Sequence, residues 1–221
     1  MTFFYQDNLA QQIDLPIGKV VCVGQNYVDH IKEMGSITND NAVLFMKPNT
    51  ALCDVEKPLI IPVEYGECHN EIEIAVLLKK PLKNATENEV ASAIWGIGVG
   101  LDLTLRDLQK QQKALGRPWE VAKSFDYSCP VSPFTPLSDI SDLQQIEFSL
   151  TVNDMVRQQG NSQLMIRSIT ELLVIISQHF TLLPGDVVMT GTPAGVGPLV
   201  ANDKLVLSLM GKQYVTSVAN C

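Results

Sequence analysis

The chain has 221 residues, of which 46% are hydrophobic and 18% charged, and its formal net charge is −8. That length and composition are ordinary for a globular protein with one sizeable core. The acidic balance argues against nucleic acid or an anionic membrane surface as the main partner. The five cysteines include no C-x-x-C pair, so we expect no disulfide framework and a reducing, cytoplasmic location. We also expect no signal peptide and no membrane span, because the longest apolar stretch, 172–176, is far too short.

Hydrophobic periodicity predicts a β-rich chain with a few short helices. In the first half we expect strands at 19–23, 42–46, 59–62, 71–78 and 95–102, and helices at 27–34 and 86–94. Thr86 and Glu89 have the spacing of a capping box, which supports the second of these helices. Thr104 and Asp107 have the same spacing and predict another helix, which should end at Gly116.

In the second half, residues 124–136 are expected to form a loop. Asn153-Asp154 lies between two apolar runs, which predicts a hairpin of strands 146–152 and 155–159. Ser168 and Glu171 form another capping-box pattern and predict a helix to about His179. The remaining strands are expected at 187–190, 205–209 and 213–218. Strands and crossover helices do not alternate regularly, so a doubly wound sheet fits poorly.

The strongest chemical signal is a pair of glutamates on the predicted strand 71–78. Strand side chains alternate between faces, so Glu71 and Glu73 point the same way, with Cα atoms roughly 7 Å apart. Like charges this close repel unless a cation joins them, and all-oxygen ligation suits Mg²⁺ or Mn²⁺. Asp102 ends a glycine-rich apolar strand and is the candidate third ligand. The alternative is a solvated strand face, on which an E-x-E pattern is common.

Basic residues elsewhere are candidates for catalysis and substrate binding. His30 and Glu33 are three apart on a predicted helix, where the carboxylate can hold the imidazole in one tautomer. Arg106 and Gln109 share a helix face just after Asp102, and Arg can grip a carboxylate with two hydrogen bonds. Lys47 and Lys123 are further candidate cations. Surface charges remain the alternative for the lysines and for the His30–Glu33 pair.

The segment Thr190–Gly197 has three glycines and the pattern of a binding loop, because glycine lets backbone N–H groups approach an anion closely. It is not a phosphate-binding P-loop, since no Gly-Lys-Ser/Thr follows. Nor is it a dinucleotide fingerprint, since Pro193 and Pro198 oppose the required helix.

Taken together, these segments resemble the fumarylacetoacetate hydrolase family, most closely its short, single-domain branch of acylpyruvases and oxaloacetate decarboxylases or tautomerases. The resemblance is carried, in the family's order, by Val23–His30, Leu44–Pro48, His69–Glu73, Leu101–Asp107, Ala122–Phe125 and Gly185–Pro193. One departure is Gln25, where the family commonly has Arg. Any charge role at that position is lost.

The resemblance implies an α+β, β-rich fold, a mixed β-sandwich roll with a few short helices. It implies a homodimer with one Mg²⁺ (or Mn²⁺) per subunit. Residues 17–221 would form one catalytic domain behind an N-terminal extension, 1–16. Metal ligands would be Glu71, Glu73 and Asp102; His30, Glu33 and Lys123 would be catalytic; and Lys47, Arg106, Gln109 and Thr192 would bind substrate.

The activity implied is metal-stabilised enolate chemistry on a small 2-oxo acid, with hydrolysis of the C–C bond of an acylpyruvate as the first choice. Three alternatives remain, because each needs the same stabilisation of negative charge on an enolate oxygen: oxaloacetate decarboxylation, keto–enol tautomerisation and 2-hydroxydienoate isomerisation. A metal-binding homologue without catalysis is the non-enzymatic alternative. Retention of His30, Glu33 and Lys123 beside the ligands argues against it.

Overall fold

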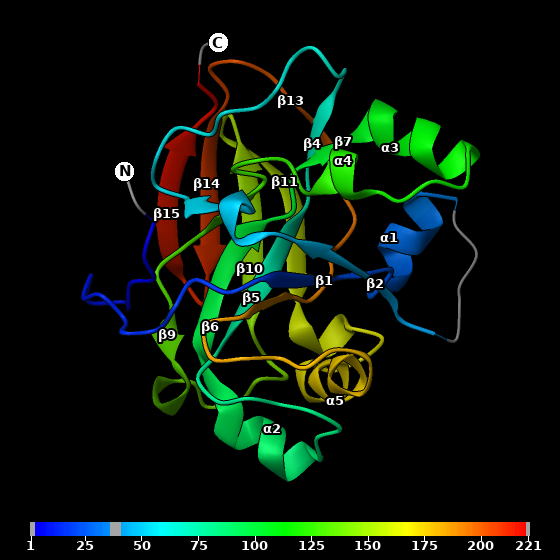
Figure 1. Cartoon of the computed structure of the whole chain (residues 1–221). Helices are drawn as coiled ribbons and strands as arrows, with labels where there is room; N and C mark the ends of the chain where they lie inside the picture. Colours follow the sequence, from blue (N-terminus) through cyan, green and yellow to red (C-terminus); the bar gives the residue numbers. More distant parts are fainter. Residues whose placement is uncertain (1–2, 36–40, 220–221) are drawn as a thin grey trace.

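The computed structural model describes residues 3–35 and 41–219, and three sheets form its framework (Figure 1). The large sheet has the order β2 (Val43–Lys47), β1 (Val20–Gly24), β12 (Val187–Met189), β5 (Ile72–Leu78), β6 (Ile94–Leu101), β8 (Cys129–Val131) and β3 (Leu52–Asp54), with β9 (Thr135–Pro136) paired to β6. A second sheet has the order β11 (Met155–Asn161), β10 (Glu147–Val152), β14 (Lys204–Leu209) and β15 (Lys212–Ser217). The small third sheet joins β13 (Gly197–Leu199), β4 (Cys68–Asn70) and β7 (Thr104–Leu105).

The core lies on both faces of the large sheet, and β5 is its centre. All seven residues of β5 are buried. Ile72, Ile74 and Val76 pack into the apolar cluster shared with β10 and β14, whereas Ala75 and Leu77 face a second cluster. This alternation confirms the predicted orientation of the strand, because every second side chain points to the same face. Its three β-branched residues, Ile72, Ile74 and Val76, favour this pleated, fully covered position.

Helices cover the edges of this framework. They are α1 (Val28–Glu33), α2 (Glu87–Ala93), α3 (Arg106–Ala114), α4 (Glu120–Lys123) and α5 (Ile169–His179). The capping boxes predicted for α2 and α5 are both present. Figure 1 shows α2 and α5 together at one end, with α1, α3 and α4 gathered on one side near β4 and β7. The functional residues come from that side.

The predicted hairpin at Asn153-Asp154 is confirmed, and the last two predicted strands form a second hairpin; the turn residues of both adopt the left-handed backbone. Asn153 (φ 49°) and Asp154 (φ 64°) join β10 to β11. Met210 (φ 49°) and Gly211 (φ 82°) join β14 to β15. Positive φ at both central residues gives a turn that matches the right-handed twist of paired strands.

Three local predictions are wrong. No strand runs over 59–62, where only Leu59 makes a bridge, to Val218; prolines at 58 and 62 remove backbone donors there. Thr104 does not cap α3: it lies in β7, its hydroxyl donates to Asp102 O, and the helix begins at Arg106. Residues 124–136 are not simply a loop, since they contain β8 and β9.

The N-terminal stretch 3–16 packs against one face of the large sheet, where Tyr5 and Ile13 join the second apolar cluster. The Tyr5 ring meets Phe134 edge-on at 5.7 Å, and its hydroxyl donates to Gly185 O. The expected fold class is confirmed: β-rich, with a curled sheet and few short helices. Within the described ranges, every helix is too short or too polar to cross a bilayer.

Candidate active site

Three acidic side chains converge where β5 begins and β6 ends. Glu71 directly precedes β5, Glu73 lies in it, and Asp102 follows β6, whose pairing with β5 sets Glu73 opposite Gly100. The Asp102 amide donates to Glu71 O at 2.8 Å, which fixes the two strand ends together. All three carboxylates are buried, and one oxygen from each lies within 4.8 Å of the others. The alternative of a solvated strand face is therefore wrong.

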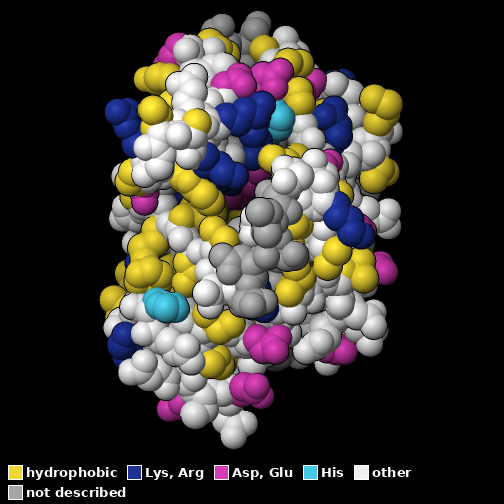
Figure 2. Space-filling model, turned by 90° about the vertical axis from the view of Figure 1, so that its right-hand side faces the viewer, with side chains coloured by type: hydrophobic (Ala, Val, Ile, Leu, Met, Phe, Trp, Pro, Cys, Tyr) yellow, Lys and Arg dark blue, Asp and Glu magenta, His cyan; other side chains and the backbone are white. Residues whose placement is uncertain are grey.

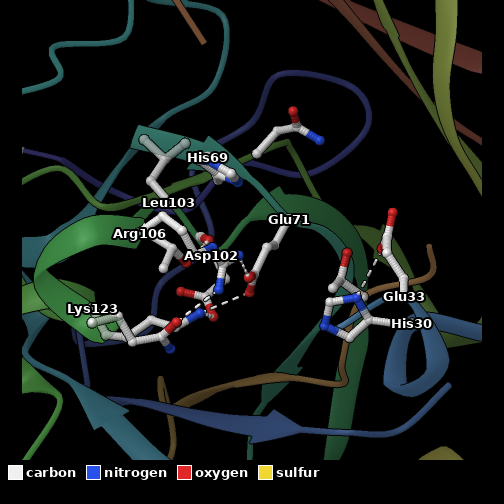
Figure 3. Close-up of polar contacts among 12 residues, drawn as sticks. His30, Glu33, His69, Glu71, Asp102, Leu103, Arg106 and Lys123 are labelled. Atoms are coloured by element: carbon white, nitrogen blue, oxygen red, sulfur yellow. Dashed lines mark hydrogen bonds and ion pairs between the residues drawn. The ribbon is translucent and has the colours of Figure 1, made fainter. Parts of the chain in front are cut away.

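Two of the three acids already contact basic groups. Lys123 Nζ lies 2.7 Å from Glu71 Oε2 and 2.5 Å from Asp102 Oδ2, and Arg106 pairs with Glu71 Oε1 (Figure 3). Lys47 Nζ lies 2.8 Å from Asp102 Oδ1, an ion-pair contact outside hydrogen-bond geometry. Both lysines are buried, so they are not surface charges.

Glu73 is different, because no basic side chain of the described residues pairs with it. Its Oε2 accepts a 2.7 Å hydrogen bond from the Gly191 amide. Burial, and then the charges of Asp102 and Glu71, hold the Glu73 pKa well above its usual value. Burial also works against ionisation of Glu71, but Lys123 and Arg106 outweigh it and lower the Glu71 pKa. Three buried carboxylates, one without a cation, suit a hard divalent ion such as Mg²⁺ or Mn²⁺.

The two members of the expected dyad meet across one turn of α1. His30 Nδ1 lies 3.4 Å from Glu33 Oε2, longer than an ordinary hydrogen bond, as catalytic contacts often are without substrate. The His30 side chain is only 11% exposed, whereas Glu33 is an exposed residue with its side chain 33% exposed, so the imidazole is the sheltered member of the pair. Figure 3 shows His30 and Glu33 beside the acidic cluster, on the side away from Lys123.

The loop 190–197 donates hydrogen bonds both to the acidic cluster and to the His30–Glu33 pair. Its Gly191 amide donates to Glu73, and its Gly195 amide donates to both oxygens of Glu33, at 3.0 and 3.2 Å. Glycine is required at both positions: φ is near +100°, and a Cβ on Gly195 would lie 2.0 Å from Arg157 O. The amides of this loop do donate to anions, and these anions are carboxylates of the protein itself; the binding of a ligand by the loop stays a prediction.

Sequence reasoning missed Gln158, which holds that loop in place. Gln158 lies in β11 and is 1% exposed. Its Nε2 donates to Thr192 Oγ1 and Pro193 O, both at 2.8 Å, and its Oε1 accepts from Asn70 Nδ2 at 2.7 Å and the Ile72 amide at 2.9 Å. All four hydrogen-bonding positions of the amide are used. A lone glutamine in an alternating strand carries no sequence signal for this role.

A small cavity of about 70 Å³ opens over the acidic cluster. Most of the residues singled out from the sequence line it: His30, Glu71, Glu73, Asp102, Arg106, Gln109, Lys123 and Thr192. Lys47 lies behind Asp102, and its contact with substrate stays a prediction. Figure 2 shows the hollow, with acidic side chains deep inside and Lys and Arg side chains beside it. A larger groove of about 890 Å³ lies elsewhere and has no acidic cluster.

Comparison with known proteins agrees with this geometry. The family model described as fumarylacetoacetate (FAA) hydrolase C-terminal matches residues 19–219. The chain is 52% identical over 207 residues to the oxaloacetate tautomerase YcgM of Escherichia coli K12, covering 93% of this chain and 94% of that protein.

Two crystal structures are also similar. One is of a fumarylacetoacetate hydrolase family protein from Yersinia pestis CO92, with 51% identity and TM-score 0.96 over 98% of this chain and 100% of that one. The other is of fumarylpyruvate hydrolase from Pseudomonas aeruginosa in complex with Mn²⁺ and pyruvate, with 32% identity and TM-score 0.92 over 98% and 95%. The acidic triad, the matched family model and these relatives lead to one conclusion: the chain belongs to the fumarylacetoacetate hydrolase family.

Proposed function

We propose that the protein is a divalent-metal-dependent enzyme that interconverts the keto and enol forms of oxaloacetate. The observation that carries the proposal is the buried triad of Glu71, Glu73 and Asp102, in one cavity with Lys123 and beside the His30–Glu33 pair. The sequence favoured acylpyruvate hydrolysis and kept the tautomerase as an alternative. The 52% identical relative, an oxaloacetate tautomerase, supports the alternative more strongly.

In this proposal the triad holds Mg²⁺ or Mn²⁺, which when bound supplies a Lewis acid that stabilises negative charge on the 2-oxo oxygen. Lys123 Nζ lies among the same carboxylates and donates a hydrogen bond toward that oxygen. Arg106 and Gln109, joined by a 2.7 Å hydrogen bond, and Thr192 orient the substrate. Lys47 holds Asp102 from behind.

Tautomerisation moves one proton and changes no other atom. In the enol-to-keto direction, the 2-hydroxyl gives its proton to solvent water, the C2–C3 double bond becomes the C2–O double bond, and C3 gains a proton. Protonated His30 donates that proton from Nε2, because its Nδ1 faces Glu33, and then regains one from solvent, so the net change is the movement of one proton from oxygen to carbon. Glu33 fixes the tautomer of His30, and the Gly195 amide fixes Glu33.

Acylpyruvate hydrolysis is the second candidate, and the 32% identical fumarylpyruvate hydrolase favours it. The same His30 would remove a proton from water, which attacks the distal carbonyl. The C–C bond then breaks and pyruvate leaves as its enol. A test of both candidates compares enol-oxaloacetate, keto-oxaloacetate, acetylpyruvate and fumarylpyruvate in Mg²⁺ buffer.

The tautomerase proposal expects fast loss of the enol form, and a loss of this activity in His30→Gln. Slow enol conversion beside fast acylpyruvate cleavage would reverse the order of the two candidates. No turnover of any of the four compounds would favour the non-catalytic alternative.

We also propose a homodimer, as the family resemblance implies. Tyr65 and Val121 are more than half exposed and border the 890 Å³ groove, which Met46 and Phe125 also line. Exposed apolar side chains gathered in this way are typical of an interaction surface. Light scattering should give twice the chain mass for the wild type and a shift toward the monomer for Val121→Glu.

A further inference from the structure

One basic side chain that lines the cavity is not tied to any acid. Arg106 pairs with Glu71 and donates to Gln109, and Lys123 pairs with Glu71 and Asp102. Lys113 also lines the cavity, yet it makes no ion pair with any residue that the structure describes. Its charge is therefore available to a ligand.

Lys113 stands at the mouth of the cavity, at the end of the helix face that lines it. Arg106, Gln109 and Lys113 have the spacing i, i+3 and i+7, which places them on one face of α3. Arg106 and Gln109 are buried and Lys113 is exposed, about 10 Å further along the axis at 1.5 Å per residue. Helical side chains lean toward the N-terminus of their helix, so Lys113 projects back toward the floor.

An aromatic wall holds Lys113 in this position. Its Nζ lies over the Trp119 ring, 5.7 Å from the centroid. Trp119 packs against Phe45 with centroids 5.9 Å apart, and Lys123 Nζ lies over Phe45 at 5.0 Å. Trp119 and Phe45 both line the cavity. The two rings therefore connect Lys123, at the bottom of the cavity, with Lys113, at its opening. The face of the Trp119 ring restrains the long Lys113 side chain.

We propose that Lys113 binds the second carboxylate of a dicarboxylic 2-oxo acid and so selects such substrates over monocarboxylic ones. This inference rests on the proposed function, which places the first carboxylate and the 2-oxo oxygen at the acidic cluster. The far end of a four-carbon dicarboxylate then points away from the floor, toward the mouth. At the opening, the unpaired ammonium of Lys113 offsets the negative charge of the second carboxylate, which the chain's net charge of −8 would otherwise repel.

The test measures binding separately from turnover. Oxaloacetate and pyruvate share the 2-oxo acid end and differ in the distal carboxylate, so the ratio of their dissociation constants isolates that group. Tryptophan fluorescence of the Mg²⁺-loaded protein is titrated with each compound for the wild type, Lys113→Met and Lys113→Arg. The matched control is Lys110→Met, an exposed lysine of the same helix whose contact is Asp107, 3.8 Å away.

Lys113→Met is expected to reduce the preference for oxaloacetate about tenfold, as for a lost hydrogen bond between charged groups. Lys113→Arg should keep most of the preference, and Lys110→Met all of it. High salt should weaken the preference in the wild type but not in Lys113→Met, because the lysine is exposed. An unchanged ratio in Lys113→Met overturns the inference.

The two proposals fail in different ways. If the wild type binds oxaloacetate in a Lys113-dependent manner but does not convert its enol form, the tautomerase proposal fails and the carboxylate site stands. If enol conversion is fast and Lys113→Met has wild-type selectivity in both binding and kcat/KM, the site fails and the tautomerase stands.

Discussion

Replacing Gln158 by leucine should loosen the active site without unfolding the protein. Leucine keeps most of the side-chain volume but removes all four hydrogen bonds of the amide. The buried Ile72 amide loses its partner and Pro193 O loses a donor, whereas Asn70 Nδ2 keeps a 3.4 Å contact with Gly195 O. One unsatisfied buried donor costs about 1–3 kcal/mol, so we expect a total near 3 kcal/mol. For a chain of this size that lowers Tm by about 6–12 °C.

The loss should extend to catalysis, because the loop held by Gln158 orients Glu73 and Glu33 through the amides of Gly191 and Gly195. We expect kcat to fall at least tenfold at a temperature where the variant is fully folded. The assays are thermal unfolding followed by circular dichroism, and enol-oxaloacetate turnover. Gln159→Leu is the matched control, since Gln159 is exposed on the same strand. A normal kcat in a destabilised Gln158→Leu would refute the positioning role, and an unchanged Tm would refute the hydrogen-bond reasoning.

Three other changes test the electrostatics of the cluster. In metal-free protein, the Glu73 pKa is higher in the folded than in the unfolded state, so the folded protein loses stability as pH rises above about 4.5, where Glu73 of the unfolded chain ionises. Glu73→Gln cannot ionise, so its Tm should exceed that of the wild type by an amount that grows with pH. A Tm difference that stays constant with pH would contradict the raised pKa. Mg²⁺ at a hundred times its dissociation constant should stabilise wild type by about 2.7 kcal/mol and leave Glu73→Gln unchanged, as thermal unfolding would report. Lys47→Met removes the 2.8 Å ion-pair contact with buried Asp102, which keeps Lys123 as its partner, and takes a donor from Ser128 O. It should cost about 1–3 kcal/mol in urea unfolding, against nearly nothing for exposed Lys80→Met.

Local signals predicted the main elements because short-range physics decides them. The Thr86 and Ser168 capping boxes and the Asn153-Asp154 turn depend only on neighbouring residues, and the structure contains all three. The strands β3 and β8 are too short to show a period. They exist because they pair with each other across the fold, Leu52 beside Cys129. Thr104 has the local pattern of a cap, but pairing with His69 draws it into a strand.

The parts of the candidate site that could be predicted are pairs of residues whose spacing in the sequence matches the repeat of a strand or a helix. Glu71 and Glu73 face the same way because the strand repeats every two residues, and His30 and Glu33 meet because the helix nearly repeats every three or four. Asp102 was a candidate because it ends a glycine-rich apolar strand, Arg106 because it shares a helix face with Gln109, and Lys123 as a further cation; the family resemblance added their expected roles. Gln158 was not predictable, since its partners lie 34 to 88 residues away and nothing nearby marks it.

The central claim is that three carboxylates hold one divalent ion and leave it open to a small 2-oxo acid. Crystals grown with Mn²⁺ and oxalate, measured at the manganese absorption edge, test it most directly. We predict one anomalous peak bounded by Glu71, Glu73 and Asp102, with oxalate on its open side and Lys123 turned to the oxalate oxygens. A peak elsewhere, or none at full Mn²⁺ loading, would contradict the account.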